Sequence, residues 1–138
     1  QYPSLINLHL NQIELNQIPF VGIGGAVPIP FHSKVKLFER GLLDRLRGML
    51  TPESVLIAHP PPKGTKDKVV GKFAAGSKGL TQLVKEVQPK MVICGHIHED
   101  TGVGALENTL VVNCSIGADG KGALIEFPDI GEPKIQML

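Results

Sequence analysis

The alternation of apolar and polar positions predicts short strands separated by amphipathic helices. Two short runs, at 54–58 and 91–94, are almost wholly apolar and rich in β-branched residues, which is typical of strands buried on both faces. Between them, apolar residues at three- and four-residue steps predict a helix over 77–87. Ser77 is its expected N-cap, and Pro89 prevents its continuation. The pattern therefore predicts a strand, a helix and a second strand in succession.

Similar patterns predict the rest of the chain. The further expected elements are a hairpin over 12–25 with its turn at Asn16 and Gln17, a stiff loop at 28–31, a helix from the N-cap Ser33 to before Pro52, a loop over 60–76, a turn through 101–104, and strands at 109–112, 123–127 and 134–138. No internal repeat or low-complexity linker divides the chain, so we expect residues 1–138 to form one α/β unit.

Composition narrows the class of protein. Hydrophobic residues make up 42% of the chain and charged residues 20%, which suits a compact core. No apolar run reaches the ~18 residues of a membrane span, so we expect no membrane association. The net charge of +1 lacks the basic excess of a nucleic-acid-binding domain. Cys94 and Cys114 lie far apart in apolar runs, which favours a reducing, cytoplasmic setting over a disulfide framework.

Three histidines follow the two buried strands. A strand, crossover helix and strand in one sheet run parallel, so their carboxyl ends share an edge, and ligands of open α/β sheets bind there. His59 follows the first strand, and His96 and His98 follow the second. If 96–98 is extended, both of its histidines face one cavity, with Gly95 allowing a tight turn. Three imidazoles suit a divalent ion such as Zn, Mn or Fe.

Other interpretations of these residues stay open. The His-x-His spacing is weak by itself, and a histidine after a strand is often an ordinary loop residue. His9 and His32 have no such placement, and we expect them on the surface. Cys94 is a soft-ligand candidate, although a cysteine in an apolar strand usually packs as a small hydrophobe.

Charged residues near the histidines are also open to two interpretations. Glu99 and Asp100, with Asp67, are the acidic candidates to ligate or orient a ligand, or they are simply solvated. The lysines of the long loop and the following helix either attract phosphate or cover a solvated surface; they are Lys63, Lys66, Lys68, Lys72 and Lys78.

Several segments, in order and spacing, resemble the calcineurin-like metallophosphoesterase superfamily. They are IPFVGIGGAVPIPF, VLIAHPPPKGTKD, AAGSKGL, QPKMVICGHIHE with its G-H-x-H motif, and NTLVVNCSIG. The resemblance spans nearly the whole chain. It implies that residues 1–138 are the C-terminal part of an α/β/β/α sandwich with mixed sheets, in which His59 and His96 bind one metal ion and His98 the other.

The resemblance also implies what this chain lacks. The family's N-terminal Asp-x-His, Gly-Asp-x-x-Asp and Gly-Asn-His-Asp/Glu motifs have no counterpart here, so we expect a missing N-terminal half or self-association as the partner. Residues 113–115 read Asn-Cys-Ser where relatives often have Asn-Pro-Gly.

The expected function is therefore that of a cytoplasmic hydrolase, a phosphatase or phosphodiesterase. Two divalent ions (Mn, Zn, Fe or Ni) would act on a phosphate-ester substrate, with no catalytic residue of this chain beyond the metal ligands. The alternative is a non-catalytic metal-binding or scaffold module of the same fold.

Overall fold

The computed structural model describes residues 5–24, 41–69, 73–117 and 122–138. Its central feature is a six-stranded mixed sheet in the order β1-β2-β3-β6-β8-β7. These strands are β1 (Asn11–Leu15), β2 (Ile18–Ile23), β3 (Val55–Ala58), β6 (Met91–Cys94), β7 (Gly102–Leu106) and β8 (Thr109–Asn113). Two short pairs accompany it, β4 (Lys68–Val69) with β5 (Phe73–Ala74), and β9 (Ala123–Glu126) with β10 (Lys134–Met137). Within the described residues the helical segments are 41–47, α2 (Lys78–Val87) and the 3₁₀ turn η1 (His98–Asp100).

The middle of the sheet is parallel. Strand β3 pairs in parallel with β6, and α2 crosses between them, which confirms the predicted βαβ unit. β2 and β8 extend the parallel arrangement on either side, whereas β1 and β7 pair antiparallel at the two edges. The carboxyl ends of β2, β3, β6 and β8 therefore meet at one edge, as a parallel sheet requires.

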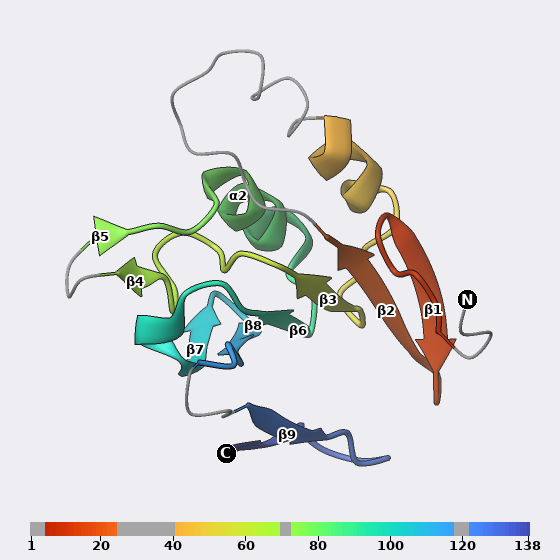
Figure 1. Ribbon diagram of the computed structural model, residues 1–138. Coiled ribbons are helices and arrows are strands. Elements are labelled where there is room, and N and C mark those ends of the chain that lie inside the picture. Colours follow the sequence, from red (N-terminus) through yellow and green to blue (C-terminus); the bar gives the residue numbers. More distant parts are fainter. Residues whose placement is uncertain (1–4, 25–40, 70–72, 118–121) are drawn as a thin grey trace.

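An apolar cluster packs against each face of this sheet. Figure 1 shows α2 on one side and the β9–β10 hairpin on the other. On the helix side the core contains Leu46, Leu56, Leu80, Leu83, Val84, Val92 and Val111. On the hairpin side Val55, Met91 and Val112 pack with Phe20, Ile125, Phe127 and Ile135. The alternation of strand side chains between two faces produces this division, and the second layer agrees with the expected sandwich.

The ends of α2 explain where the helix starts and stops. The Ser77 hydroxyl accepts a hydrogen bond from the Leu80 N–H at 3.1 Å, which confirms the predicted N-cap. Gln88 ends the helix in the left-handed region at φ 52, and its N–H donates to the Val84 carbonyl at 2.7 Å. Within the described ranges no helix is both long and apolar enough to cross a membrane.

Most predicted strands are present, with two corrections. The turn of the hairpin lies at Asn16 and Gln17, both with positive φ, as two-residue hairpin turns favour. The expected loop 60–76 contains the β4–β5 pair, and the expected turn at 101–104 is instead part of strand β7. Gly104 serves close packing, because a Cβ there would lie 3.0 Å from the Thr65 methyl group. The expected N-cap Ser33 and the loop 28–31 lie outside the described residues.

Candidate metal centre

His59 and His96 meet at the carboxyl edge of the sheet. His59 follows β3 directly, and His96 follows β6 after one residue, Gly95. The Gly95 N–H donates to the His59 carbonyl at 3.0 Å, which ties the two strand ends together. Nε2 of His59 lies 3.0 Å from Nδ1 of His96, and both residues are solvent-exposed. The predicted convergence of these two histidines is therefore present in the structure.

The backbone at His96 is strained. His96 has φ 73, and the Ile97 N–H donates to the Gly95 carbonyl at 2.9 Å, so these three residues form a γ-turn with its centre at His96. This γ-turn is the rare form with positive φ, which costs a non-glycine residue free energy. The tight turn predicted at Gly95 is wrong, because His96 itself makes it. Such strain is concentrated at functional sites.

His98 lies apart from this pair. The expected extended path from 96 to 98 is wrong, because the γ-turn and the 3₁₀ turn η1 replace it. Nδ1 of His98 is 3.7 Å from where a Cβ on Gly117 would lie, so its ring lies beside the segment that follows β8. Among the residues the structure describes, no three His, Cys, Asp or Glu side chains are close enough to hold one metal ion. His32 lies outside those residues.

Cys94 belongs to the core. It is 3% exposed, packs on the helix side of the sheet and donates its thiol to the Val112 carbonyl at 3.5 Å. Burial, with a smaller effect of the nearby Cys114, raises the pKa of the Cys94 thiol to about 12. A cysteine buried in this way packs as a small hydrophobe of the core. Burial also raises the pKa of Cys114, and both cysteines are free.

The acidic candidates make structural contacts. Asp67 is buried and accepts a hydrogen bond from the Gly76 N–H at 2.9 Å. Asp100 lies 3.3 Å from the Lys66 ammonium and accepts from the Lys68 N–H at 3.0 Å. Partial burial alone would raise the pKa of Asp100, but the hydrogen bonds and charges of the two lysines lower it below its ordinary value. Glu99 is exposed.

The lysines expected to attract phosphate differ in their surroundings. Lys66 forms an ion pair with Asp100, while Lys68 and Lys78 are exposed and Lys63 is half-buried. Lys72 lies outside the described residues. Lys68 and Lys78 therefore have the surroundings of ordinary solvated surface residues, and Lys66 has those of an ion-paired residue.

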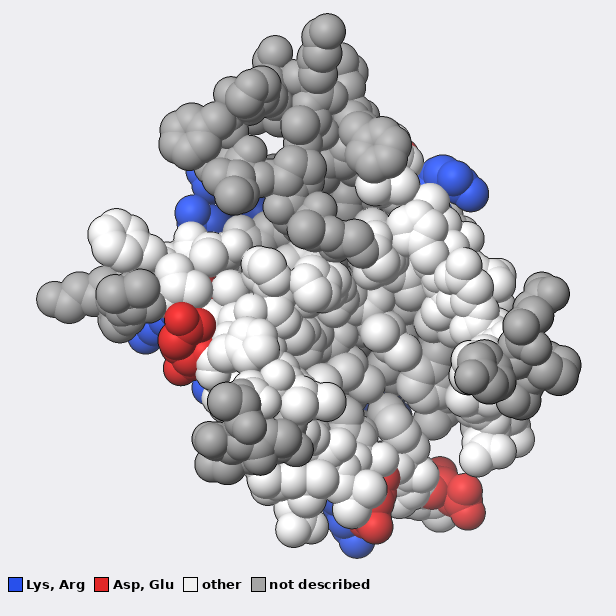
Figure 2. All heavy atoms as spheres, in the orientation of Figure 1, with Lys and Arg blue, Asp and Glu red and all other residues white. Residues whose placement is uncertain are grey.

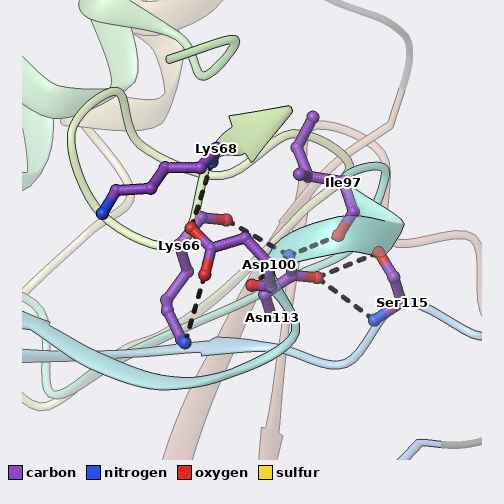
Figure 3. Close-up of polar contacts among 6 residues, drawn as sticks. All are labelled: Lys66, Lys68, Ile97, Asp100, Asn113 and Ser115. Carbon is purple, nitrogen blue, oxygen red and sulfur yellow. Dashed lines mark hydrogen bonds and ion pairs between the residues drawn. The ribbon is translucent and has the colours of Figure 1, made fainter. Parts of the chain in front are cut away.

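The side chain of Asn113 forms hydrogen bonds to the segments around His98, a role that was not predicted from the sequence. Figure 3 shows its side chain between the Lys66 loop, the η1 turn and Ser115. Its amide group donates to the carbonyls of Lys66, Ile97 and Asp100, and its oxygen accepts from Ser115. The available sequence signal was a polar residue at the end of an apolar strand, one residue before Cys114.

An open groove of about 380 Å³ lies next to His59. His9 also lines it, and Nδ1 of His9 accepts a hydrogen bond from the Gly24 N–H at 3.0 Å. His9 is exposed, as expected for a surface residue. Apolar residues, among them Leu8, Ile23 and Ile57, line the groove with the two histidines.

The histidine pair fits one divalent ion. Nitrogen ligands lie about 2.0–2.1 Å from zinc, so two ligand nitrogens of one tetrahedral ion lie about 3.3 Å apart. Nε2 of His59 and Nδ1 of His96 are joined by a hydrogen bond of 3.0 Å, so a small outward movement of the rings would bring them to this spacing. The described residues bring no carboxylate to the same point, so the pair is only part of a ligand set.

Comparisons with known proteins indicate the family of this chain. Residues 41–137 match a family described as "Metallophosphoesterase, calcineurin superfamily". The uncharacterized protein MJ1162 of Methanocaldococcus jannaschii is 28% identical over 117 residues, covering 80% of this chain and 54% of that protein. Human Metallophosphoesterase domain-containing protein 1 is 44% identical over 71 residues, covering 49% of this chain and 22% of that protein.

Solved structures share the fold. The protein TT1561 of Thermus thermophilus has a TM-score of 0.56 at 16% identity, covering 85% of this chain and 52% of that one. A second solved structure has a TM-score of 0.75 at 21% identity, covering 99% of this chain and 55% of that one. The chain thus spans about half the length of these structures and of MJ1162. The family match covers most of the chain, and the chain belongs to the calcineurin superfamily of metallophosphoesterases.

Proposed function

We propose that this chain supplies the histidine ligands of a metal-dependent phosphoesterase that hydrolyses phosphate mono- or diesters. The observation that carries the proposal is the 3.0 Å separation of the His59 and His96 ring nitrogens at the carboxyl edge of the sheet. His59 and His96 would hold one ion, and His98 would hold a second. The position of His98 outside the pair supports this division.

The chain's own residues have distinct tasks in this proposal. Two divalent ions, with Mn, Zn, Fe or Ni as candidates, would supply the charge that stabilises a phosphoryl transition state. The hydrogen bond from the Gly95 N–H to the His59 carbonyl joins the two strand ends that carry the first two imidazoles. The γ-turn at His96 holds its ring toward His59 at the end of β6. Each imidazole would bind its ion through an unprotonated ring nitrogen.

A further polypeptide segment would complete the site. Ile57 is 39% exposed although β3 is a central parallel strand, a type that is normally covered on both faces. Leu124 on the β9–β10 hairpin is 50% exposed. On the side of the molecule that Figure 2 draws, the charged side chains lie toward the outline. We therefore propose that a segment carrying acidic ligands covers this apolar surface, and that without it the chain self-associates.

The cellular setting that we propose is the cytoplasm. Neither cysteine forms a disulfide, and burial raises the pKa of both thiols. Proteins of reducing compartments keep their thiols in this state.

Reconstitution tests the function. The chain is incubated with Mn²⁺ and a chromogenic phosphodiester, alone and together with a polypeptide that carries the family's three N-terminal motifs. We expect turnover only in the mixture, lost in His59→Ala and His96→Ala and kept in the control His9→Ala. If the mixture binds two ions and hydrolyses neither a phosphodiester nor a phosphomonoester, the phosphoesterase proposal is wrong. A single, fully protein-coordinated ion without hydrolysis would instead indicate a metal-binding module.

A further inference from the structure

The loop that carries the histidine motif arches over the end of β8. In the sheet register, Asn113 is the partner of Cys94 on β6 and also of Gly102 on β7. Residues 95–101 therefore leave the sheet on one side of β8 and return on the other. Asn113 is the last residue of β8 and lies under this loop with none of its surface exposed. Its side chain consequently occupies the space that the arch encloses (Figure 3).

Both the nitrogen and the oxygen of the Asn113 carboxamide form hydrogen bonds. Nδ2 donates to the carbonyls of Ile97 at 2.7 Å, Asp100 at 3.0 Å and Lys66 at 3.2 Å. Oδ1 accepts from the N–H of Ser115 at 3.1 Å and from its hydroxyl at 2.9 Å. A backbone N–H can only donate and a carbonyl can only accept, so these neighbours determine which end is nitrogen. The amide group is thus held in one orientation.

These bonds bracket His98. The carbonyls of Ile97 and Asp100 lie on either side of it in the chain, so Asn113 fastens both ends of its short 3₁₀ turn. Ser115, held by the same amide, starts the segment that reaches Gly117, which lies beside the His98 ring. We infer that Asn113 is a positioning residue, which sets the place of His98 relative to the His59–His96 pair. The use of this placement for metal binding rests on the proposed function.

Only an amide satisfies this environment. Aspartate has nearly the same shape, but its second oxygen would face the carbonyl oxygens of Ile97, Asp100 and Lys66, and these would lose their donor. A buried carboxylate with donors from Ser115 at only one of its oxygens would add to the disruption. Asn113→Asp therefore changes the chemistry of the site with little change in volume.

The control must destabilise β8 without reaching the loop. Val112→Ala removes a buried side chain that packs toward the β9–β10 hairpin. It lowers the stability of the whole chain and leaves the hydrogen bonds of Asn113 in place. Comparison with this variant separates a positioning effect from a general loss of stability.

The test is made on the metal-free chain 1–138 by NMR. We expect amide exchange in residues 97–101 to be about tenfold faster in Asn113→Asp than in Val112→Ala of equal stability, because the opening is local. The His98 ring signal should shift or broaden, and the His59 ring signal should not move. If Asn113→Asp does not fold, Ser115→Ala removes one bond to Oδ1 and should produce a smaller change at the same residues. Equal exchange and an unmoved His98 signal in the folded variant would overturn the inference.

Added Mn²⁺ separates this inference from the proposed function. In the wild-type chain the ion should broaden the ring signals of His59, His96 and His98, and in the variant it should broaden that of His98 less. Absence of broadening at His98 in the wild type would remove its metal role. The positioning role of Asn113 would still be decided by the metal-free comparison.

Discussion

Replacing His96 with glycine should make the chain more stable while it removes a proposed metal ligand. A non-glycine residue in a sparsely populated region with positive φ costs about 1–3 kcal/mol. His96 has φ 73, which glycine adopts as readily as negative φ. Glycine loses about 0.5–1 kcal/mol through its greater freedom in the unfolded chain. The exposed ring buries little surface, so the net gain from His96→Gly is about 1 kcal/mol.

Urea unfolding of four variants isolates the backbone contribution. His96→Ala keeps the positive φ and also loses the imidazole, so the difference between His96→Gly and His96→Ala reports the strain less the entropy cost of glycine. We expect His96→Gly to be more stable by about 1–2 kcal/mol, which corresponds to a few degrees in Tm. At His98, in the 3₁₀ turn, the order should reverse, with alanine more stable than glycine by about 0.5–1 kcal/mol.

The relative stabilities of His96→Gly and His96→Ala can contradict the assignment of strain to His96. If His96→Gly is no more stable than His96→Ala, then the γ-turn stores no free energy at this position. The same preference for glycine at positions 96 and 98 would likewise contradict the local explanation, since only His96 has a positive φ.

Three further substitutions test other parts of the structure. Cys94→Ser should leave metal binding intact and cost about 1–3 kcal/mol in urea unfolding, because it buries a hydroxyl in the core; a loss of metal equal to that of His96→Ala would make Cys94 a ligand. Gly76→Ala should destabilise by about 1–3 kcal/mol, since its Cβ would lie 2.7 Å from the Pro61 carbonyl oxygen, whereas the control Gly122→Ala meets nothing within 4 Å. Asp100 has a lowered pKa in the folded chain, so its contribution is present above the unfolded value and is lost as pH falls through the folded one. The stability difference between wild type and Asp100→Asn should therefore shrink between pH 7 and pH 2, and a constant difference would contradict the assigned contacts.

The parts of the fold predicted from sequence are those that local patterns determine. The buried strands β3 and β6 consist of apolar residues, many of them β-branched. Ser77 caps α2 through a hydrogen bond to Leu80, only three residues along the chain. The meeting of His59 and His96 followed from these elements, because a βαβ crossover makes the two strands parallel.

The local sequence did not reveal the details that depend on distant contacts. Asn113 bonds to Lys66 across 47 residues of sequence, and no pattern near either residue indicates that pairing. The positive φ of His96 was missed because the adjacent glycine was the more obvious site for a turn. Strand β7 was missed because its glycines resemble a turn, although Gly104 provides space for the Thr65 side chain. Tertiary packing overrode the local preference in each case.

Mn²⁺ binding to the chain and three histidine variants tests the proposed metal centre most directly. Free Mn²⁺ is measured by electron paramagnetic resonance during titration of wild type, His59→Ala, His96→Ala and the control His9→Ala. We expect wild type and His9→Ala to bind Mn²⁺ with the same Kd, and the other two variants to bind about tenfold or more weakly, because even changes around a metal ligand cost 10–100-fold. Equal Mn²⁺ binding by all four proteins would contradict a metal ion shared by His59 and His96.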